Sequence, residues 1–388
     1  MAKDFIKTLS LIVCFILPVT AFSQTISRKG IIFKKDSTFY ARINARIQTL
    51  YQGEYSIDDK AYEDGIQVRR ARVKMEGFAL SEQFEYKIEL ALSNTDMANS
   101  SPENSNSPNL VLDAFSKWNF APGFSFWFGQ TKLPGNRERV ISSQKLQFVD
   151  RSLLNTRYNL DRDMGVQLHH TFKTGNVSFR EVAALSMGEG RNITTGNKGG
   201  YDYTGRVEVY PLGEFKDEGD YFGADLSRED RPKLAVGLTY DYNDRASRER
   251  GQLGEFLSGS RDLKTFFADA MFKYRGFSVM TEFVDRETDG SAVVARNDAG
   301  DITEAFFTGT GFNLQSGYLF KNNVEIAGRY SSVNAENEIQ EPDEKQWTLG
   351  FSKYFVDHTL KIQSDVSLLR ENRQNSEVMY RFQVEIGF

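Results

Sequence analysis

Apolar and polar residues alternate along most of this 388-residue chain, from Thr38 to the last residue. In the first such segment, Ala41, Ile43 and Ala45 alternate with Arg42 and Asn44. Side chains of a β-strand point to opposite faces in turn, so a period of two predicts strands, and no segment shows a helical period. The pattern predicts an all-β fold with sixteen strands, at residues 38–50, 70–77, 84–93, 110–120, 124–131, 166–172, 177–186, 203–211, 234–243, 265–275, 277–286, 306–320, 324–331, 347–355, 359–369 and 378–388.

The connections between these strands are long and short in turn. The segments 94–109 and 132–165 are long, whereas 121–123 and 173–176 are short. Tyr51–Gly65 is also expected to be a long, polar connection, and 212–233 is a long segment where the alternation requires a short one. Long loops at one end, short turns at the other and an even strand number are typical of outer-membrane barrels. The sequence therefore predicts a transmembrane antiparallel β-barrel of about sixteen strands over residues 38–388.

A soluble β-sandwich would show similar alternation, but the polar faces of the first strands carry many charges, and this favours a membrane barrel. An Arg or Lys side chain facing lipid at mid-depth costs about 2–4 kcal/mol. The charged faces must therefore point into a wet interior, and a barrel of this size is wide enough to hold an aqueous channel. We predict a basic wall in the lumen that consists of Arg42, Arg46, Arg70, Arg72 and Lys74.

The first 23 residues have the composition of a secretory signal peptide. Lys3 and Lys7 precede the apolar run Leu9–Val19, and Ala21 and Ser23 have the small-x-small spacing of a cleavage site. The sequence contains one cysteine, Cys14, which would leave with the signal peptide. Residues 1–23 are predicted to be this signal peptide and residues 24–37 a periplasmic N-terminal segment.

Neither composition nor motifs favour an enzyme or a nucleic-acid-binding protein. The formal net charge is −5, which gives no global reason to expect nucleic-acid binding. The three histidines are His169, His170 and His358, and neighbouring residues of a strand face opposite sides, so the first two cannot share a site. We therefore predict no catalytic residue, no cofactor and no metal site.

The longest connection carries the most distinctive chemistry. Residues 132–163 contain seven basic and four acidic side chains, a net charge of +3 in an acidic chain. The segment also contains apolar residues such as Ile141, Phe148 and Leu154, which a merely solvated loop would not need. We predict that this third loop folds into the lumen and forms an anion-attracting constriction; a surface loop with local Arg–Asp pairs is the alternative. The predicted constriction residues are Lys132, Arg137, Arg139, Lys145, Arg151, Arg157 and Arg162.

Four pieces of this region form a recognisable set: GQTKLP at 129–134, RERVISS at 137–143, FVDRS at 148–152 and RDMGV at 162–166. With them, the sequence resembles the phosphate-selective porin O and P family, especially its forms from Bacteroidetes-like bacteria. The resemblance implies a sixteen-stranded, trimeric channel for general diffusion or with a preference for anions. Strict phosphate specificity is not inferred, because the predicted lumen also carries many carboxylates.

Together these observations predict a porin in the outer membrane of a Gram-negative bacterium, forming a water-filled channel for small solutes with a modest preference for anions such as phosphate. The alternatives are a structural or ligand-gated uptake component and, less favoured, a barrel enzyme. The expected partners are small anions, outer-membrane lipids, a homotrimer and the assembly machinery that reads a last strand ending at Phe388; no nucleic-acid partner is expected.

Overall fold

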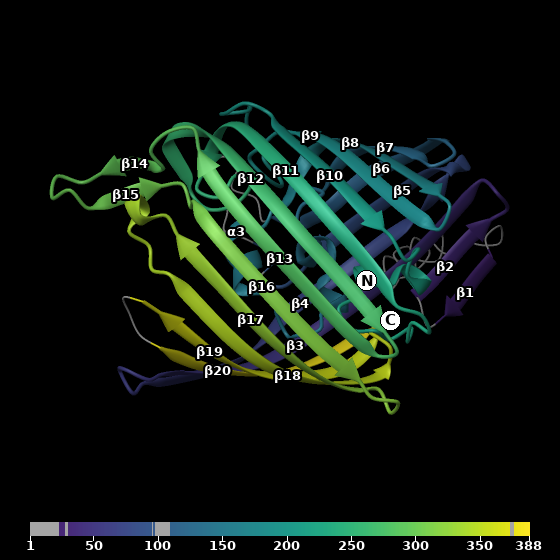
Figure 1. Cartoon of the computed structure of the whole chain (residues 1–388). Coiled ribbons are helices and arrows are strands. Elements are labelled where there is room, and N and C mark those ends of the chain that lie inside the picture. The colour runs from purple at the N-terminus through teal and green to yellow at the C-terminus, as the bar shows by residue number, and fades with distance from the viewer. Residues whose placement is uncertain (1–22, 28–29, 95, 98–108, 373–375) are drawn as a thin grey trace, which may run out of the picture.

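The computed structural model is a closed antiparallel β-barrel (Figure 1). It describes residues 23–27, 30–94, 96–97, 109–372 and 376–388. The last strand pairs with the first barrel strand, from Glu377 opposite Ser56 to Gly387 opposite Arg46, so the wall has no open edge along these residues. The sixteen strands of the wall are β3 (Phe39–Ser56), β4 (Tyr62–Ala79), β5 (Ser81–Ala91), β6 (Val111–Ala121), β7 (Phe124–Lys132), β8 (Arg162–Thr174), β9 (Val177–Ser186), β10 (Asp202–Tyr210), β11 (Lys233–Arg248), β12 (Phe256–Tyr274), β13 (Phe277–Thr288), β16 (Gly309–Leu319), β17 (Val324–Ala335), β18 (Glu344–Val356), β19 (Leu360–Glu371) and β20 (Glu377–Gly387).

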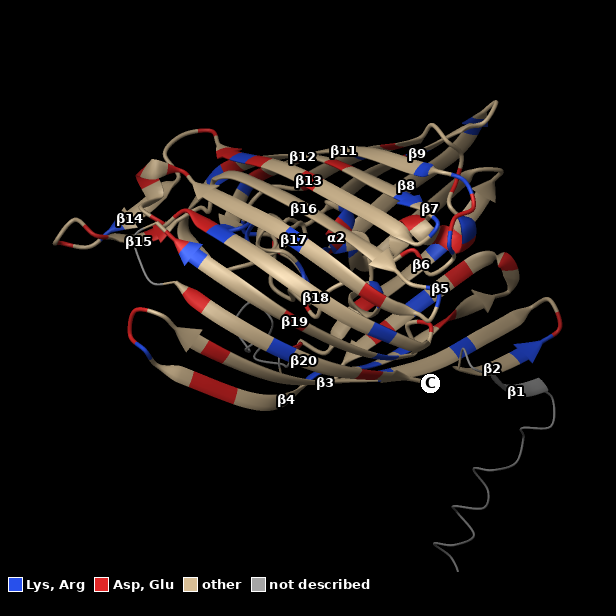
Figure 2. Ribbon diagram, turned by 60° about the horizontal axis from the view of Figure 1, so that its bottom comes forward, with Lys and Arg blue, Asp and Glu red and all other residues tan. Residues whose placement is uncertain are grey.

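The alternation seen in the sequence separates an outer apolar face from a polar interior. Along β10, Thr204 and Arg206 are buried, whereas Tyr203 and Val207, on either side of this pair, are 49% and 45% exposed. Polar residues thus face inward and apolar residues face outward, the reverse of a soluble protein, as a lipid environment requires. Figure 2 shows the charged residues as bands across the strands and as groups in the loops at both ends.

The first two barrel strands are longer than predicted. Tyr51–Gly65 is not a long loop: Tyr55 pairs with Tyr62, and only residues 57–61 connect β3 to β4. A membrane strand needs about 9–11 residues, so these strands of 18 residues extend well beyond a bilayer. Where both faces of a strand contact water the apolar–polar alternation disappears, which is why the sequence pattern ended too early.

An N-terminal hairpin, which the alternation did not predict, precedes the barrel. It consists of β1 (Ser23–Ser27) and β2 (Gly30–Lys35). Strand β2 pairs with the start of β3, from Ile31 opposite Ile43 to Lys35 opposite Phe39. It thereby covers the part of β3 that lies beyond the end of β20. The predicted signal peptide lies outside the described residues, apart from Ser23 at the start of β1.

Two connections form elements of their own. At one end, β14 (Val293–Arg296) and β15 (Ile302–Ala305) form a hairpin that projects from the barrel (Figure 1). At the other end, the connection between β10 and β11, which is long where the alternation of connections requires a short turn, contains the 3-10 helix η3 (Lys216–Tyr221). The inward-facing Lys273 Nζ donates to the carbonyls of Gly219, Phe222 and Ala224 at 2.8, 2.8 and 2.7 Å. This connection therefore folds against the interior of the barrel.

The third loop, residues 133–161, folds into the lumen as predicted and is called the inward loop below. It contains α2 (Arg137–Val140), the 3-10 helix η2 (Ser143–Lys145) and α3 (Leu153–Tyr158), which lies inside the barrel in Figure 1. These short helices, like η4 (Asn337–Ile339) in a later loop, correct the expectation of a chain without helices. Each is too short to produce a periodic signal in the sequence. Among the described residues, no helix has the length and apolar character needed to cross a bilayer.

Closure of the wall has a consequence for unfolding. Because neighbouring strands satisfy one another's backbone hydrogen bonds around the ring, the barrel should unfold slowly and as one unit. We therefore expect membrane-purified protein to migrate differently on a detergent gel before and after boiling. Identical migration of the two samples would contradict a closed barrel.

Candidate functional site

One face of the inward loop is fixed to the barrel wall by a buried arginine. Arg137, in α2, is fully buried, and its Nε and Nη2 donate to Asp269 on β12 and Glu208 on β10 at 2.8 and 2.7 Å. Arg206 on β10 contacts the same two carboxylates, each at 2.7 Å. Two cations and two anions therefore neutralise each other, and Arg137 anchors the loop rather than facing open space.

Apolar contacts continue this attachment. Leu154 and Tyr158 of α3 pack with Phe267 on β12 and Val284 on β13 in one buried cluster. The N–H of Leu154 also donates to the Ser331 hydroxyl on β17 at 3.1 Å. Inward-facing apolar side chains are unfavourable in a wet lumen, so their presence here marks where the loop displaces water. The inward loop thus fills the interior along β10–β17.

The other face of the loop is held by Asp150. Its carboxylate accepts from Arg70 at 2.7 Å and from Arg69 at 3.2 Å, and Arg381 lies 3.9 Å away. A β-bulge, in which Thr49 pairs with Val68 after Gln48 pairs with Arg70, brings both Arg69 and Arg70 to this carboxylate. Burial alone would raise the pKa of Asp150, but the guanidinium groups outweigh burial and hold the pKa below its ordinary value.

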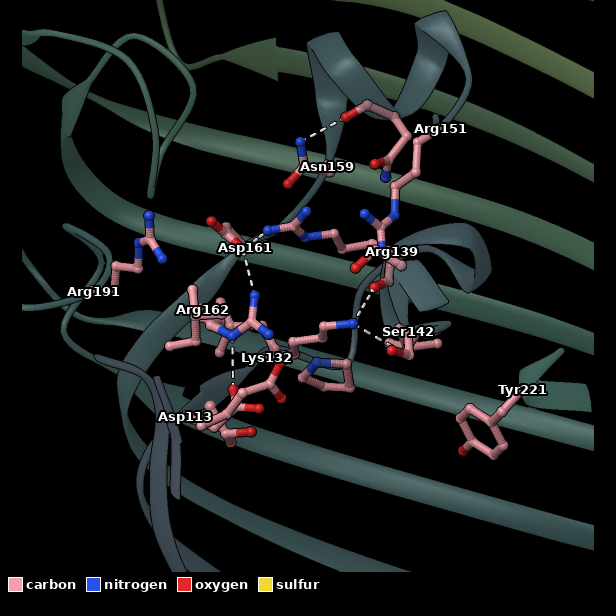
Figure 3. Close-up of a pocket in the computed structure, with 18 of the residues that line it drawn as sticks. Asp113, Lys132, Arg139, Ser142, Arg151, Asn159, Asp161, Arg162, Arg191 and Tyr221 are labelled. Carbon is pink, nitrogen blue, oxygen red and sulfur yellow. Dashed lines mark hydrogen bonds and ion pairs between the residues drawn. The ribbon is translucent and has the colours of Figure 1, made fainter. Parts of the chain in front are cut away.

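Between these two attachments a cavity of about 760 Å³ remains open (Figure 3). Strands β4–β9 supply most of its wall, and the inward loop supplies the opposite side. Among the described residues that line it, twelve are Lys or Arg and seven are Asp or Glu. The open part of the lumen is therefore electropositive, although the whole chain is acidic.

Four of the predicted constriction residues meet in this cavity: Lys132, Arg139, Arg151 and Arg162. Lys132 Nζ donates to the Arg139 carbonyl at 2.7 Å, and Arg151 Nη2 donates to the Ile141 carbonyl at 2.7 Å. Carbonyl groups orient these cations without neutralising them. By contrast, Arg162 is paired with Asp113 on β6 at 2.7 Å, and Arg139 is paired with Asp161.

The other three predicted constriction residues lie elsewhere. Arg137 is the buried anchor described above. Lys145 Nζ lies 3.7 Å from the ring centroid of Phe222, in the folded connection between β10 and β11. Arg157 makes a bidentate pair with Glu344 on β18 at 2.8 and 2.9 Å. The structure therefore does not bring these three into the cavity.

The predicted basic wall is divided in the same way. Arg70 and Arg72 line the cavity, and Arg72 is paired with Asp96 at 2.7 Å. Arg42 lines a second cavity of about 590 Å³. Arg46 is buried against Glu385 at 3.2 Å, and Lys74 contacts Glu76 at 3.0 Å. Each of the five has a carboxylate partner, so this wall is closer to neutral than its basic residues suggest.

Several cavity residues were not identified from the sequence. Arg191 reaches the cavity from the loop between β9 and β10, where its Nη2 donates to the Asp96 carbonyl at 2.7 Å. Arg69 reaches it through the bulge. A loop and a bulge both lie outside the regular alternation, so the pattern of the sequence contains no signal for either. Within the described part of the chain, no group of three or more His, Cys, Asp or Glu side chains is placed to hold a metal ion.

Comparison with known proteins supports the family resemblance that the sequence motifs indicate. Residues 41–384 match the model of the family described as phosphate-selective porin O and P. Comparison with curated protein sequences gives no match. Among solved structures, the chain is similar to an anion-selective porin from Comamonas acidovorans, with 11% identity, a TM-score of 0.57 and coverage of 90% of this chain and 99% of that one.

Two further structures share the fold. OprB of Pseudomonas putida is 10% identical, with a TM-score of 0.55 and coverage of 90% and 94%. The trimer form of OmpT, an outer membrane protein of Vibrio cholerae, is 10% identical, with a TM-score of 0.50 and coverage of 90% and 99%. At these identities the likeness concerns the fold alone, and the family match covers most of the barrel. The chain belongs to the phosphate-selective porin O and P family.

Proposed function

We propose that the protein is a porin through which small solutes diffuse passively, and that the cations around the larger cavity give it a modest preference for anions such as phosphate. The observation that carries this proposal is the excess of twelve basic over seven acidic residues at the cavity. A fixed positive charge in a narrow passage raises the local concentration of anions. Guanidinium groups also offer paired donors that match phosphate and carboxylate oxygens.

The selectivity should be modest because the same cavity contains carboxylates. Asp113, Asp150 and Asp161 each neutralise part of the surrounding charge. A solute anion must compete with them for the guanidinium groups.

The second cavity supplies a continuation of the pathway. It shares Lys87, Phe115 and Trp127 with the first cavity, and it is also lined by Lys34 of β2 and Arg42 of β3. A solute that leaves the inward loop would thus pass further cations near the N-terminal hairpin. The proposed route follows β3–β8, whereas the inward loop and the folded connection fill the opposite half of the barrel.

A planar-bilayer measurement tests this function directly. In a KCl gradient we expect the reversal potential of the purified protein to have the sign of an anion-preferring channel, with current present before any solute is added. A cation-preferring potential would contradict the proposed selectivity. A current that appears only after addition of a solute would favour the ligand-gated alternative.

We further propose that the chain is exported by a signal peptide at residues 1–23, which leaves 24–37 in the periplasm and 38–388 as the barrel in the outer membrane. Strand β20 and Phe388 would be the signal read by the assembly machinery, and the exposed apolar face would contact outer-membrane lipids. A homotrimer is the proposed assembly. The trimer form of the similar Vibrio cholerae protein supports this assembly.

A further inference from the structure

Three aromatic rings form a row across β6, β7 and β8 where the two cavities meet. Phe115 stacks on Trp127 with ring centroids 4.7 Å apart and planes 11° apart. Trp127 stacks on His169 at 4.1 Å and 19°. All three side chains line the larger cavity, and Phe115 and Trp127 also line the second one. A solute that moves between the cavities must therefore pass this row, which is called the ring row below.

The geometry shows which surface of the ring row a solute meets. The centroid spacings are close to the separation of neighbouring strands, about 4.7–4.9 Å. The ring faces are thus turned toward one another around the wall, and their edges point into the channel. Aromatic edges carry partial positive charge and prefer the face of another ring, in an edge-to-face contact.

Cationic groups lie near the ring row. Gln167 Nε2 donates to the backbone carbonyl of Lys132 at 2.9 Å and its Oε1 lies 3.0 Å from His169 Nε2, and the Lys132 side chain lines the same cavity as the three rings. Lys117 Nζ lies over the face of Trp127, 5.7 Å from its centroid, and 3.2 Å from Glu85. A ligand that carries both a negative group and a flat ring would find a partner for each part.

We propose that the ring row is a subsite for the cyclic part of organic anions, such as aromatic carboxylates and phosphonates. The proposal rests on the anion preference argued above and refines its substrate class. An inorganic anion or a short aliphatic one gains only from the positive field. An anion with a ring also gains an edge-to-face contact and displaces water from apolar edges, so it remains longer in the passage.

Block of the chloride current through single channels by two probes of similar charge tests this inference. For the unmodified protein we expect phenylphosphonate to reach half-block at a concentration about fivefold lower than methylphosphonate. In Trp127→Leu this ratio should fall close to one. The matched control is Trp118→Leu, which removes the same side chain from the outer face of the neighbouring strand, where Trp118 is 47% exposed. The control should keep the fivefold ratio.

A second variant distinguishes the loss of a ring contact from a folding defect. Phe115→Leu keeps an apolar side chain at one end of the ring row and should lower the ratio in part, with heat-dependent gel migration unchanged. If the reversal potential shows anion preference but the two phosphonates block equally, the ring row is not a subsite. If the channel prefers cations, the proposed function itself fails. A ratio that falls equally in Trp118→Leu would also overturn the inference, because the effect would not come from the lumen.

Discussion

Replacing Arg137 by Ala should give a folded barrel with a larger and less steady conductance. Loss of one partner from a buried ion pair costs about 3–5 kcal/mol, because the remaining charges stay buried and uncompensated. Here Glu208 and Asp269 would keep only Arg206 as a close cationic partner. The inward loop would lose its polar attachment to β10 and β12 and leave the filled half of the lumen for part of the time. The wall should stay closed, because its backbone hydrogen bonds do not involve Arg137.

Single-channel recording together with gel migration measures both effects. Lys145→Ala is the matched control: it removes a cation of the same loop that lies outside the cavity and whose Nζ lies 3.7 Å from the ring centroid of Phe222. A cation–π contact of this kind contributes about 0.5–1 kcal/mol, so the control should conduct nearly as the unmodified protein does. A folded Arg137→Ala barrel with unchanged, steady conductance would show that Arg137 does not anchor the loop.

Neutralising Arg139 and Arg151 together should move the reversal potential toward cation preference. Both side chains line the larger cavity, and the double change to Gln removes two charges from it while keeping polar side chains of moderate size. The shift should be larger in 0.1 M than in 1 M salt, because the Debye length falls from about 10 Å to about 3 Å over this range. Arg137 is not a suitable member of this pair, because it is neutralised in the anchor.

The control for this pair removes two charges outside the cavity. Arg231 and Arg245 are exposed side chains, so Arg231→Gln with Arg245→Gln changes the net charge equally without changing the cavity lining. Arg191, although it lies in a loop between strands, would be a poor control because it reaches the cavity. Equal shifts from both double variants would place the selectivity in the overall charge of the protein rather than in the cavity.

The strands of the barrel wall could be predicted from the sequence, because every strand of a membrane barrel follows one simple physical rule. Each strand has one face in lipid and one in water, and all sixteen predicted strands correspond to strands of the structure. The rule fails where both faces are wet, as in the outer parts of β3 and β4. It also gave no hint of the N-terminal hairpin, where only short strands pair at the rim.

The site was less accessible to sequence reasoning, because alternation tells which face a residue occupies and not which residue it meets. Arg137 and Arg139 are two positions apart and have the same chemistry. One is neutralised by Glu208 and Asp269, more than 70 residues away in the case of Glu208, whereas the other borders the cavity. The positive charge and apolar residues of the loop could be read from the sequence, but its long-range pairings could not.

Because half of the barrel is filled, the width of the barrel does not determine the size of the molecules that pass. Strand number and tilt determine the circumference, but packed protein occupies the lumen along β10–β17 and leaves a one-sided passage. The exclusion limit is therefore encoded in the length and side-chain volumes of two connections, residues 133–161 and 211–232, rather than in the strands. Shortening or thinning either segment could alter molecular sieving without disturbing a single inter-strand hydrogen bond, so permeability and barrel integrity can evolve independently.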